Sequence, residues 1–112
     1  MIDWTRVLEL RSEVGAEDFD EVVDLFLDEV QDVIDRLSTH PDQAQFEADF
    51  HFLKGSALSL GFTAFSDLCG AGEERAASGQ DVSDDLPALL TCYANARAQF
   101  LTELPRRLAT AA

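Results

Sequence analysis

Apolar residues recur every three or four positions along most of the chain, which is the repeat of an α-helix with one buried side. This repeat predicts a short first helix over residues 3–13 and four longer helices over residues 19–38, 41–60, 63–79 and 86–105. No segment shows the two-residue alternation that is typical of a β-strand. We therefore expect an all-α fold, an up-down-up-down antiparallel four-helix bundle with a short additional N-terminal helix as a lid on one end.

Several residues suit the ends of these helices. Asp3 is expected to cap the first helix, and Asp18 with Glu21 three residues later forms a variant of the capping box. Pro105 is expected to kink or end the last helix, because an interior proline removes a backbone hydrogen bond. Four further residues are expected at helix boundaries: Gly15 and Gly61 after C-termini, Pro41 in a first turn and Thr63 as an N-cap.

The third helix has a well-defined side for the core, which consists of Phe46, Phe50, Leu53, Ala57 and Leu60. The two helices that follow are expected to bury Leu68 and Leu101 among their apolar residues. Gly70 and Gly72 each cost a helix about 1 kcal/mol relative to alanine. Either the fourth helix is locally weak or its glycines allow unusually close packing, and we favour close packing.

Length and composition favour one domain over residues 1–112, with a short capping helix in 1–15 and the four-helix bundle in 18–108. The formal charge of −14 would repel nucleic acid and anionic lipid, so neither is expected as a partner. The sequence shows no signal peptide and no apolar run long enough to span a membrane, so we expect a soluble cytoplasmic protein. Cys69 and Cys92 are expected to be reduced core thiols, and nothing requires more than a monomer.

The stretch FHFLKGSALSLGF, residues 50–62, places polar residues next to this core. At about 100° per residue, His51 lies roughly 140° from the centre of the buried side, so it is expected to face solvent. Gly55 lies one turn later beside His51, and Leu58 lies a further turn along the same face. Lys54 is expected on the flank of this face, within reach of the imidazole.

This exposed group has the residues that phosphoryl transfer requires. A histidine in water is largely neutral at cellular pH, so one ring nitrogen keeps a lone pair and can attack phosphorus. The Lys54 ammonium would offset the charge of a bound phosphoryl group by ~1 kcal/mol at a partly screened distance. Gly55 would let a partner's active site close over His51, because it has no side chain. Leu58 and Phe62 would add apolar contact area around the reactive nitrogen.

The sequence HFLKGSALSLG, followed by Cys69 and then by Glu73 and Glu74, resembles the histidine-containing phosphotransfer (HPt) domains of two-component phosphorelays. Those domains are small helical proteins built round a four-helix bundle, and the histidine of their H-x-x-K-G motif is exposed in mid-helix. The resemblance covers nearly the whole chain, because the order of the helices also fits. The family commonly has a leucine where this chain has Gly72, a departure that concerns the packing of the fourth helix.

By position, the resemblance implies that His51 accepts a phosphoryl group from the aspartyl phosphate of a receiver domain and passes it to another receiver. Lys54 would assist phosphate binding and Gly55 would provide clearance. Ser56 would hold the helix by a local hydrogen bond and lie in the partner-binding surface with Leu58 and Phe62. In many relatives a polar side chain of the following helix reaches toward the histidine, and either Glu73 or Glu74 could take that place.

The implied partners are response-regulator receiver domains and a hybrid sensor histidine kinase. The chain has no nucleotide-binding loop and no nucleophile elbow, so we expect a phosphocarrier that is not an enzyme and depends on its partner for catalysis. No cofactor is expected on this chain, and Mg²⁺ is expected in the receiver domain.

The two alternatives to this function are a metal site and an interaction module. Glu47 and His51 could share a helix face and bind a metal ion, but carboxylate-bridged metal sites in bundles need a second histidine on a helix, and His40 belongs to a turn. The alternative function is a non-catalytic acidic helical interaction module, which would need no reactive histidine.

Overall fold

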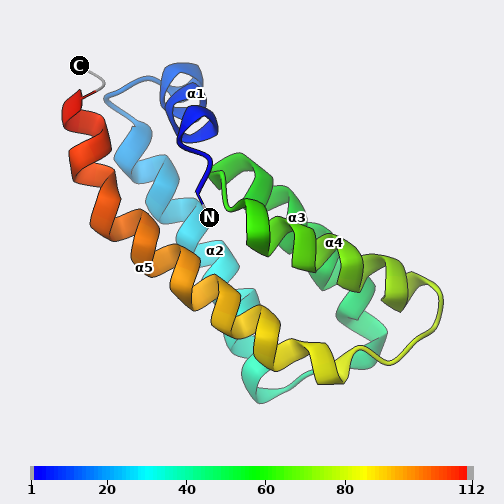
Figure 1. Cartoon of the computed structure of the whole chain (residues 1–112). Coiled ribbons are helices and arrows are strands. Elements are labelled where there is room, and N and C mark those ends of the chain that lie inside the picture. The colour runs from blue at the N-terminus through cyan, green and yellow to red at the C-terminus, as the bar shows by residue number, and fades with distance from the viewer. Residues whose placement is uncertain (1, 111–112) are drawn as a thin grey trace.

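Five α-helices make up the fold (Figure 1). The computed structural model describes residues 2–110, and its helices are α1 (Trp4–Val14), α2 (Phe19–Thr39), α3 (Phe46–Leu60), α4 (Thr63–Ala77) and α5 (Leu86–Thr110). Two 3₁₀ turns, Gln43–Gln45 and Ser83–Asp85, precede α3 and α5. Among the described residues the only strand-like pairing is an isolated antiparallel bridge between Ile2 and Phe62, so the all-α prediction is confirmed.

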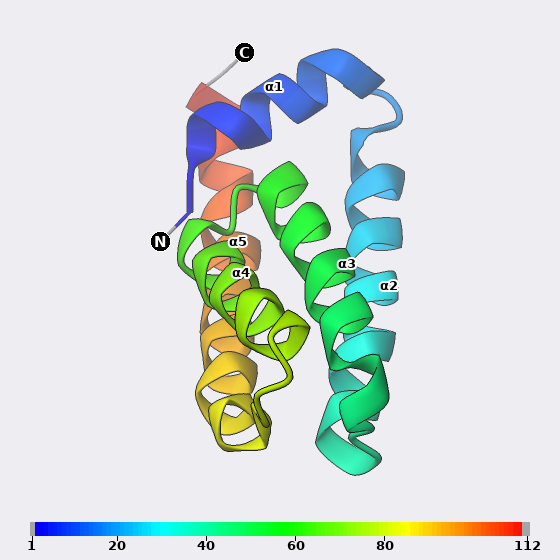
Figure 2. The same cartoon turned by 90° about the vertical axis from the view of Figure 1, so that its right-hand side faces the viewer.

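The helices α2 to α5 lie side by side, and α1 crosses one end of them (Figures 1 and 2). Each helix packs on the next, and α5 also packs on α2. The most extensive contact is between α3 and α4, while α1 rests on α2 and α3. This arrangement agrees with a helical bundle that carries a short N-terminal helix across one end.

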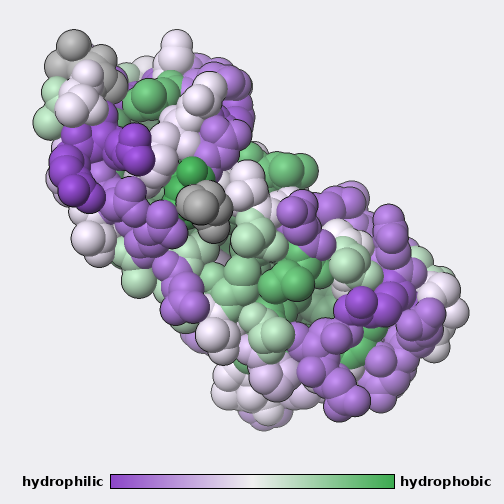
Figure 3. Space-filling model, viewed as in Figure 1, coloured by the Kyte–Doolittle hydropathy of each residue, from purple (hydrophilic) through white to green (hydrophobic). Residues whose placement is uncertain are grey.

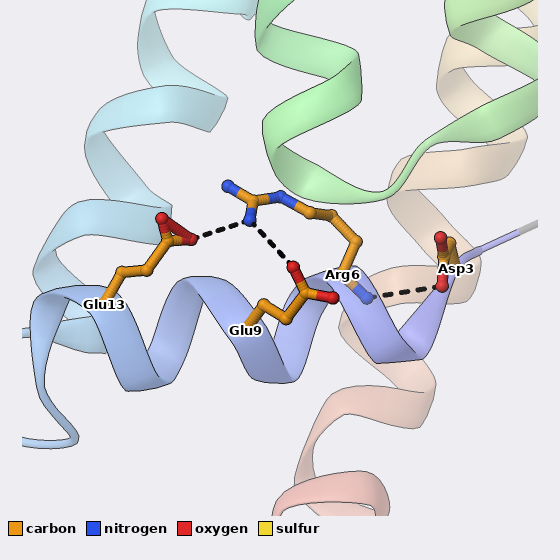
Figure 4. Close-up of polar contacts among 4 residues, drawn as sticks. All are labelled: Asp3, Arg6, Glu9 and Glu13. Carbon is orange, nitrogen blue, oxygen red and sulfur yellow. Dashed lines mark hydrogen bonds and ion pairs between the residues drawn. The ribbon is translucent and has the colours of Figure 1, made fainter.

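Helix α1 begins and ends where the sequence predicts. The Asp3 carboxylate accepts a hydrogen bond of 3.2 Å from the backbone N–H of Arg6, as a capping residue does (Figure 4). The Arg6 guanidinium donates to Glu13 at 2.6 Å and to Glu9 at 3.4 Å along the exposed side of the helix (Figure 4). Gly15 ends the helix with a φ of 90°, a conformation that glycine adopts without strain.

Gly61 makes the turn between α3 and α4, in the left-handed conformation predicted for it, with a φ of 76°. The start of the chain passes close to this turn, because the backbone N–H of Asp3 donates to the Gly61 carbonyl at 2.7 Å. A Cβ atom at Gly61 would lie 2.6 Å from the Asp3 carbonyl oxygen. Glycine is therefore required here both for its conformation and for the close approach of the backbone of Asp3.

Two predicted N-caps differ from expectation. Asp18 occupies the N-cap position of α2 but makes no side-chain capping bond, so the capping box with Glu21 does not form. Its backbone already has helical angles (φ −96°, ψ −7°), whereas a capping side chain needs an extended backbone to reach the first free N–H groups. Thr63 is the first residue of α4, and the N-cap position belongs to Phe62, because the chain enters α4 directly from the turn at Gly61.

The two prolines at predicted boundaries also differ from expectation. Pro41 lies before the helix, since Asp42 caps a 3₁₀ turn by accepting from the backbone N–H of Ala44, and α3 begins only at Phe46. Helix α5 continues through Pro105 to Thr110, so the predicted end at this proline is wrong. The proline has no N–H to bond the carbonyl of Leu101, a residue that is 42% exposed.

The predicted core side of α3 is confirmed. Its five apolar residues are fully buried: Phe46, Phe50, Leu53, Ala57 and Leu60. Leu68 and Leu101 were expected in the core, but both are exposed, because the neighbouring helices contact α4 and α5 along narrower stripes. The stripe of α4 is centred on Phe65 and Cys69, and that of α5 on Tyr93 and Phe100.

Gly72 brings α4 unusually close to α3. A Cβ atom added at Gly72 would lie 2.9 Å from the ring of Phe50, closer than real carbon contacts allow. The expectation that glycine permits close packing in α4 is therefore confirmed at this position. A leucine at position 72 would therefore not fit here without movement of the Phe50 ring.

A partly buried ion pair links α2 to α3. The Arg36 guanidinium donates to both carboxylate oxygens of Asp49, at 2.6 and 2.9 Å. The Asp49 side chain is buried, so this two-point pairing satisfies a charge that would otherwise be costly inside the protein. Because Asp49 is two residues before His51 in α3, the pair also fixes the rotation of the segment that carries the histidine.

On the face shown in Figure 3, apolar residues gather between α4 and α5, and polar residues cover much of the surface around them. The aspartates of α2 that were predicted to face outward are all exposed: Asp24, Asp28, Asp32 and Asp35. Across residues 2–110, no helix combines the length and the apolar character needed to cross a membrane.

Replacement of Phe50 by alanine is expected to lower the free energy of unfolding by about 3 to 5 kcal/mol, because it removes a fully buried ring that packs on Phe46 and Gly72. Urea denaturation followed by circular dichroism measures the change. Phe52→Ala is a matched control, since it removes the same side chain from a partly exposed position and should cost no more than about 1.5 kcal/mol. Equal losses in the two variants would contradict the burial described for α3.

Candidate functional site

His51 lies on the exposed face of α3. Its neighbours along the sequence include Phe50 and Leu53, which are buried on the core side of the helix. The His51 side chain is 72% exposed, which confirms the orientation expected from the helical repeat. The residue that precedes it points into the core because adjacent residues of a helix are turned by about 100°. The core packing of α3 therefore fixes the backbone from which the imidazole projects.

Glu73 of α4 contacts the imidazole. One carboxylate oxygen, Oε2, lies 2.8 Å from Nδ1 of His51, which is a hydrogen-bond distance. Of the two candidates, Glu73 is therefore the residue that reaches the histidine. Glu74 is the next residue of α4, and its side chain is exposed. The close approach of α4 to α3 at Gly72, one residue earlier, brings the Glu73 side chain within reach of the histidine.

The same carboxylate also binds Lys54. The other oxygen of Glu73, Oε1, lies 2.6 Å from Nζ of Lys54, so the Lys54 ammonium forms an ion pair with Glu73. The Glu73 side chain is only 19% exposed and lies between the two basic groups. The pKa of its carboxyl is lowered, chiefly by the hydrogen bond from Lys54, against an opposing effect of desolvation and with a smaller contribution from His51. Glu73 is therefore ionised at neutral pH.

The ionised carboxylate determines which ring nitrogen carries the proton. A carboxylate without a proton can only accept hydrogen bonds, so Nδ1 of a neutral His51 must be the donor in the 2.8 Å contact. The other ring nitrogen, Nε2, then has the free lone pair. A histidine held in this way presents a nucleophilic nitrogen at the protein surface.

The surface next to His51 is open and partly apolar. A Cβ atom added at Gly55 would meet nothing within 4 Å, and Leu58, further along the same face, is 57% exposed. Phe52 also contributes an exposed apolar ring, although it was not among the residues predicted for this surface. The helical repeat could have identified it, because Phe52 is turned by about 100° from both His51 and the core side of α3.

Two residues expected in the partner-binding surface are buried. Phe62 is 1% exposed, and its ring packs on those of Phe100 and Tyr93, at centroid distances of 5.4 and 6.3 Å. The chain leaves the α3 axis at Gly61, so the exposed face of α3 does not continue to Phe62. Ser56 is also buried, on the inward part of α3. Neither side chain is available to a docked partner.

Neither cysteine forms a disulfide. Cys69 and Cys92 are free, as predicted, and burial raises the pKa of the Cys69 thiol to about 12. In the part of the chain that the structure describes, no group of three or more histidine, cysteine, aspartate or glutamate residues is arranged to hold a metal ion.

A family model described as Hpt domain matches residues 21–99. The chain belongs to the Hpt domain family. The match extends from α2 into α5 and includes His51, Lys54 and Glu73. Neither the curated proteins nor the solved structures gave a match.

Membership of the Hpt family gives the general role of the chain. Hpt domains are phosphotransfer carriers of two-component signalling, and they are carriers rather than catalysts. They interact with receiver domains and histidine kinases in phosphorelays. The helical bundle of α2 to α5 is consistent with this family.

The two glycines near this Hpt site should respond in opposite ways to alanine. Gly55→Ala is expected to raise the free energy of unfolding by about 1 kcal/mol, because the added methyl group enters open space and improves helix propensity. Gly72→Ala should instead lower it by about 1 to 2 kcal/mol, because its methyl group meets the Phe50 ring. Thermal and urea unfolding measure both changes, and a loss of stability in Gly55→Ala would contradict the open surface at this position.

Proposed function

We propose that His51 is the phosphoacceptor, and that Nε2 takes a phosphoryl group from the aspartyl phosphate of one receiver domain and passes it to another. The observation that carries this proposal is the contact between Nδ1 and the ionised Glu73 carboxylate, on a histidine that is 72% exposed. This contact leaves the lone pair on the outer nitrogen, where a receiver can reach it.

The transfer exchanges one bond to phosphorus for another. The Nε2 lone pair attacks phosphorus while the bond from phosphorus to the aspartyl oxygen breaks, and that electron pair returns to the carboxylate of the receiver. The proton on Nδ1 stays in place, so the product is a phosphoimidazolium whose positive ring faces Glu73. Transfer to the second receiver is the reverse of this step. Mg²⁺ and the acidic pocket belong to the receiver in this proposal.

Gly55 and Leu58 give the receiver a surface on which to dock. The absence of a side chain at Gly55 leaves space beside the reactive nitrogen, and Leu58 with the neighbouring Phe52 offers apolar area. Gly55 destabilises the helix by about 1 kcal/mol relative to alanine without any internal contact that needs it. The space that Gly55 leaves for a docked partner explains why a glycine is present despite this loss of helix stability.

The rest of the proposal concerns the protein as a whole. We propose a single domain that works as a monomer in the cytoplasm, with α2 to α5 in the up-down-up-down order. An acidic interaction module without chemistry is less favoured, because it would give no role to a histidine held at 2.8 Å by an ionised carboxylate.

The proposal predicts that a phosphorylated receiver labels the wild-type chain on His51. The label should be stable in base and labile in acid, as a phosphoimidazole is, and it should be absent from the His51→Gln variant. Because His51 is exposed, this variant should unfold within about 0.5 kcal/mol of the wild type. Label on the folded variant at the wild-type level would refute His51 as the phosphoacceptor.

A further inference from the structure

One carboxylate binds both groups that a phosphoryl group on His51 would need. Glu73 accepts from Nδ1 of His51 through Oε2 and from Nζ of Lys54 through Oε1, at 2.8 and 2.6 Å. The sequence predicts Lys54 on the flank of this face, within reach of the imidazole, where its charge would offset that of a phosphoryl group. In the unphosphorylated protein that charge is instead paired with Glu73.

The position of Lys54 is also limited by its stem. A Cβ atom at Gly70 would lie 3.4 Å from Cδ of Lys54, which means that the aliphatic part of the side chain runs along α4 at this glycine. From there the ammonium reaches the carboxylate of Glu73, one turn further along α4. The packing of α4 on α3 thus directs Lys54 toward Glu73.

A phosphoryl group on Nε2 would change the charges around this carboxylate. It adds about two negative charges close to Glu73, which is itself ionised. The two anions then compete for the single ammonium of Lys54 and repel one another. A carrier benefits from such competition, because it must release the group that it has accepted.

We infer that Glu73 is a positioning residue that limits how tightly His51 retains a phosphoryl group, by competing with it for Lys54 and by holding the proton on Nδ1. The inference rests on the proposed role of His51. It differs from a role in folding, since it concerns the equilibrium and the lifetime of the phosphorylated form.

Both actions of Glu73 favour departure of the phosphoryl group. When the bond from Nε2 to phosphorus breaks, its electron pair returns to Nε2 while the next acceptor oxygen bonds to phosphorus. With a proton held on Nδ1, the leaving group is a neutral imidazole, whereas without it the leaving group would be an imidazolate anion. Competition for Lys54 removes part of the stabilisation that would hold the phosphoryl group in place.

Glu73→Gln tests this inference, with Glu74→Gln as the matched control that removes the same charge from the adjacent, exposed residue. Each variant and the wild type are loaded with phosphoramidate, which phosphorylates imidazole directly, and ³¹P NMR gives the half-life of the phosphoimidazole. A receiver domain is then added, and the fraction of label left on the carrier at equilibrium is measured. Both substitutions are repeated in a Lys54→Ala background.

Glu73→Gln should lengthen the half-life and raise the label retained by about two- to fivefold, the range of a partly exposed charge pair. Glu74→Gln should match the wild type. In the Lys54→Ala background the effect of Glu73→Gln should fall to half or less, because the ammonium for which Glu73 and the phosphoryl group compete is then absent. Equal retention in Glu73→Gln and Glu74→Gln, or an undiminished effect without Lys54, would overturn the inference.

The two readouts separate this inference from the proposed function. Loading by phosphoramidate does not involve a receiver, so a longer half-life in Glu73→Gln supports the role of Glu73 by itself. If the loaded wild-type carrier transferred nothing to any receiver, the relay role of His51 would fail while the retention effect stood. Normal transfer with identical half-lives would overturn the role of Glu73 and leave the relay role intact.

Discussion

The close contact of α4 with α3 at Gly72 is the constraint on which the site depends. A single added carbon atom would lie 2.9 Å from the Phe50 ring, so the two helices could not approach in this way with any other residue unless the ring moved. Glu73 is the next residue of α4, and Phe50 precedes His51 in α3. The contact in the core therefore sets the distance between the carboxylate and the imidazole at the surface, which is 2.8 Å.

Core and site are thus coupled through adjacent residues of two helices. Phe50 and Gly72 face inward and His51 and Glu73 lie beside them at the surface, because successive helical residues are turned by about 100°. The pair of Arg36 and Asp49 further restrains α3 from the side of α2. The imidazole is consequently held by a rigid framework although its ring is largely in solvent, which reduces the reorganisation needed when a receiver docks.

Much of this could be predicted from the sequence, since it follows from the period of a single helix. The repeat in residues 46–60 was enough to place Phe50 inside and His51 outside. The choice between Glu73 and Glu74 was not predictable, because it depends on the rotation of α4 about its axis, which the contact of Gly72 with Phe50 sets. Phe62 was misplaced for a related reason: the repeat of α3 ends at Gly61, where the chain turns. Asp18 and Thr63 have suitable residue types for N-caps, but the turns before α2 and α4 set their backbone angles.

The proposed function requires that Glu73 keep the proton on Nδ1 of His51 and leave Nε2 as the reactive nitrogen. Long-range ¹H–¹⁵N correlation spectra of the imidazole, recorded at neutral pH on the unphosphorylated protein, test it most directly. We expect the His51 ring in the Nδ1–H form, with an unprotonated Nε2, and a smaller share of this form in Glu73→Gln. A wild-type ring found mainly in the Nε2–H form would rule out this role of Glu73, because the nitrogen that faces solvent would then have no free lone pair.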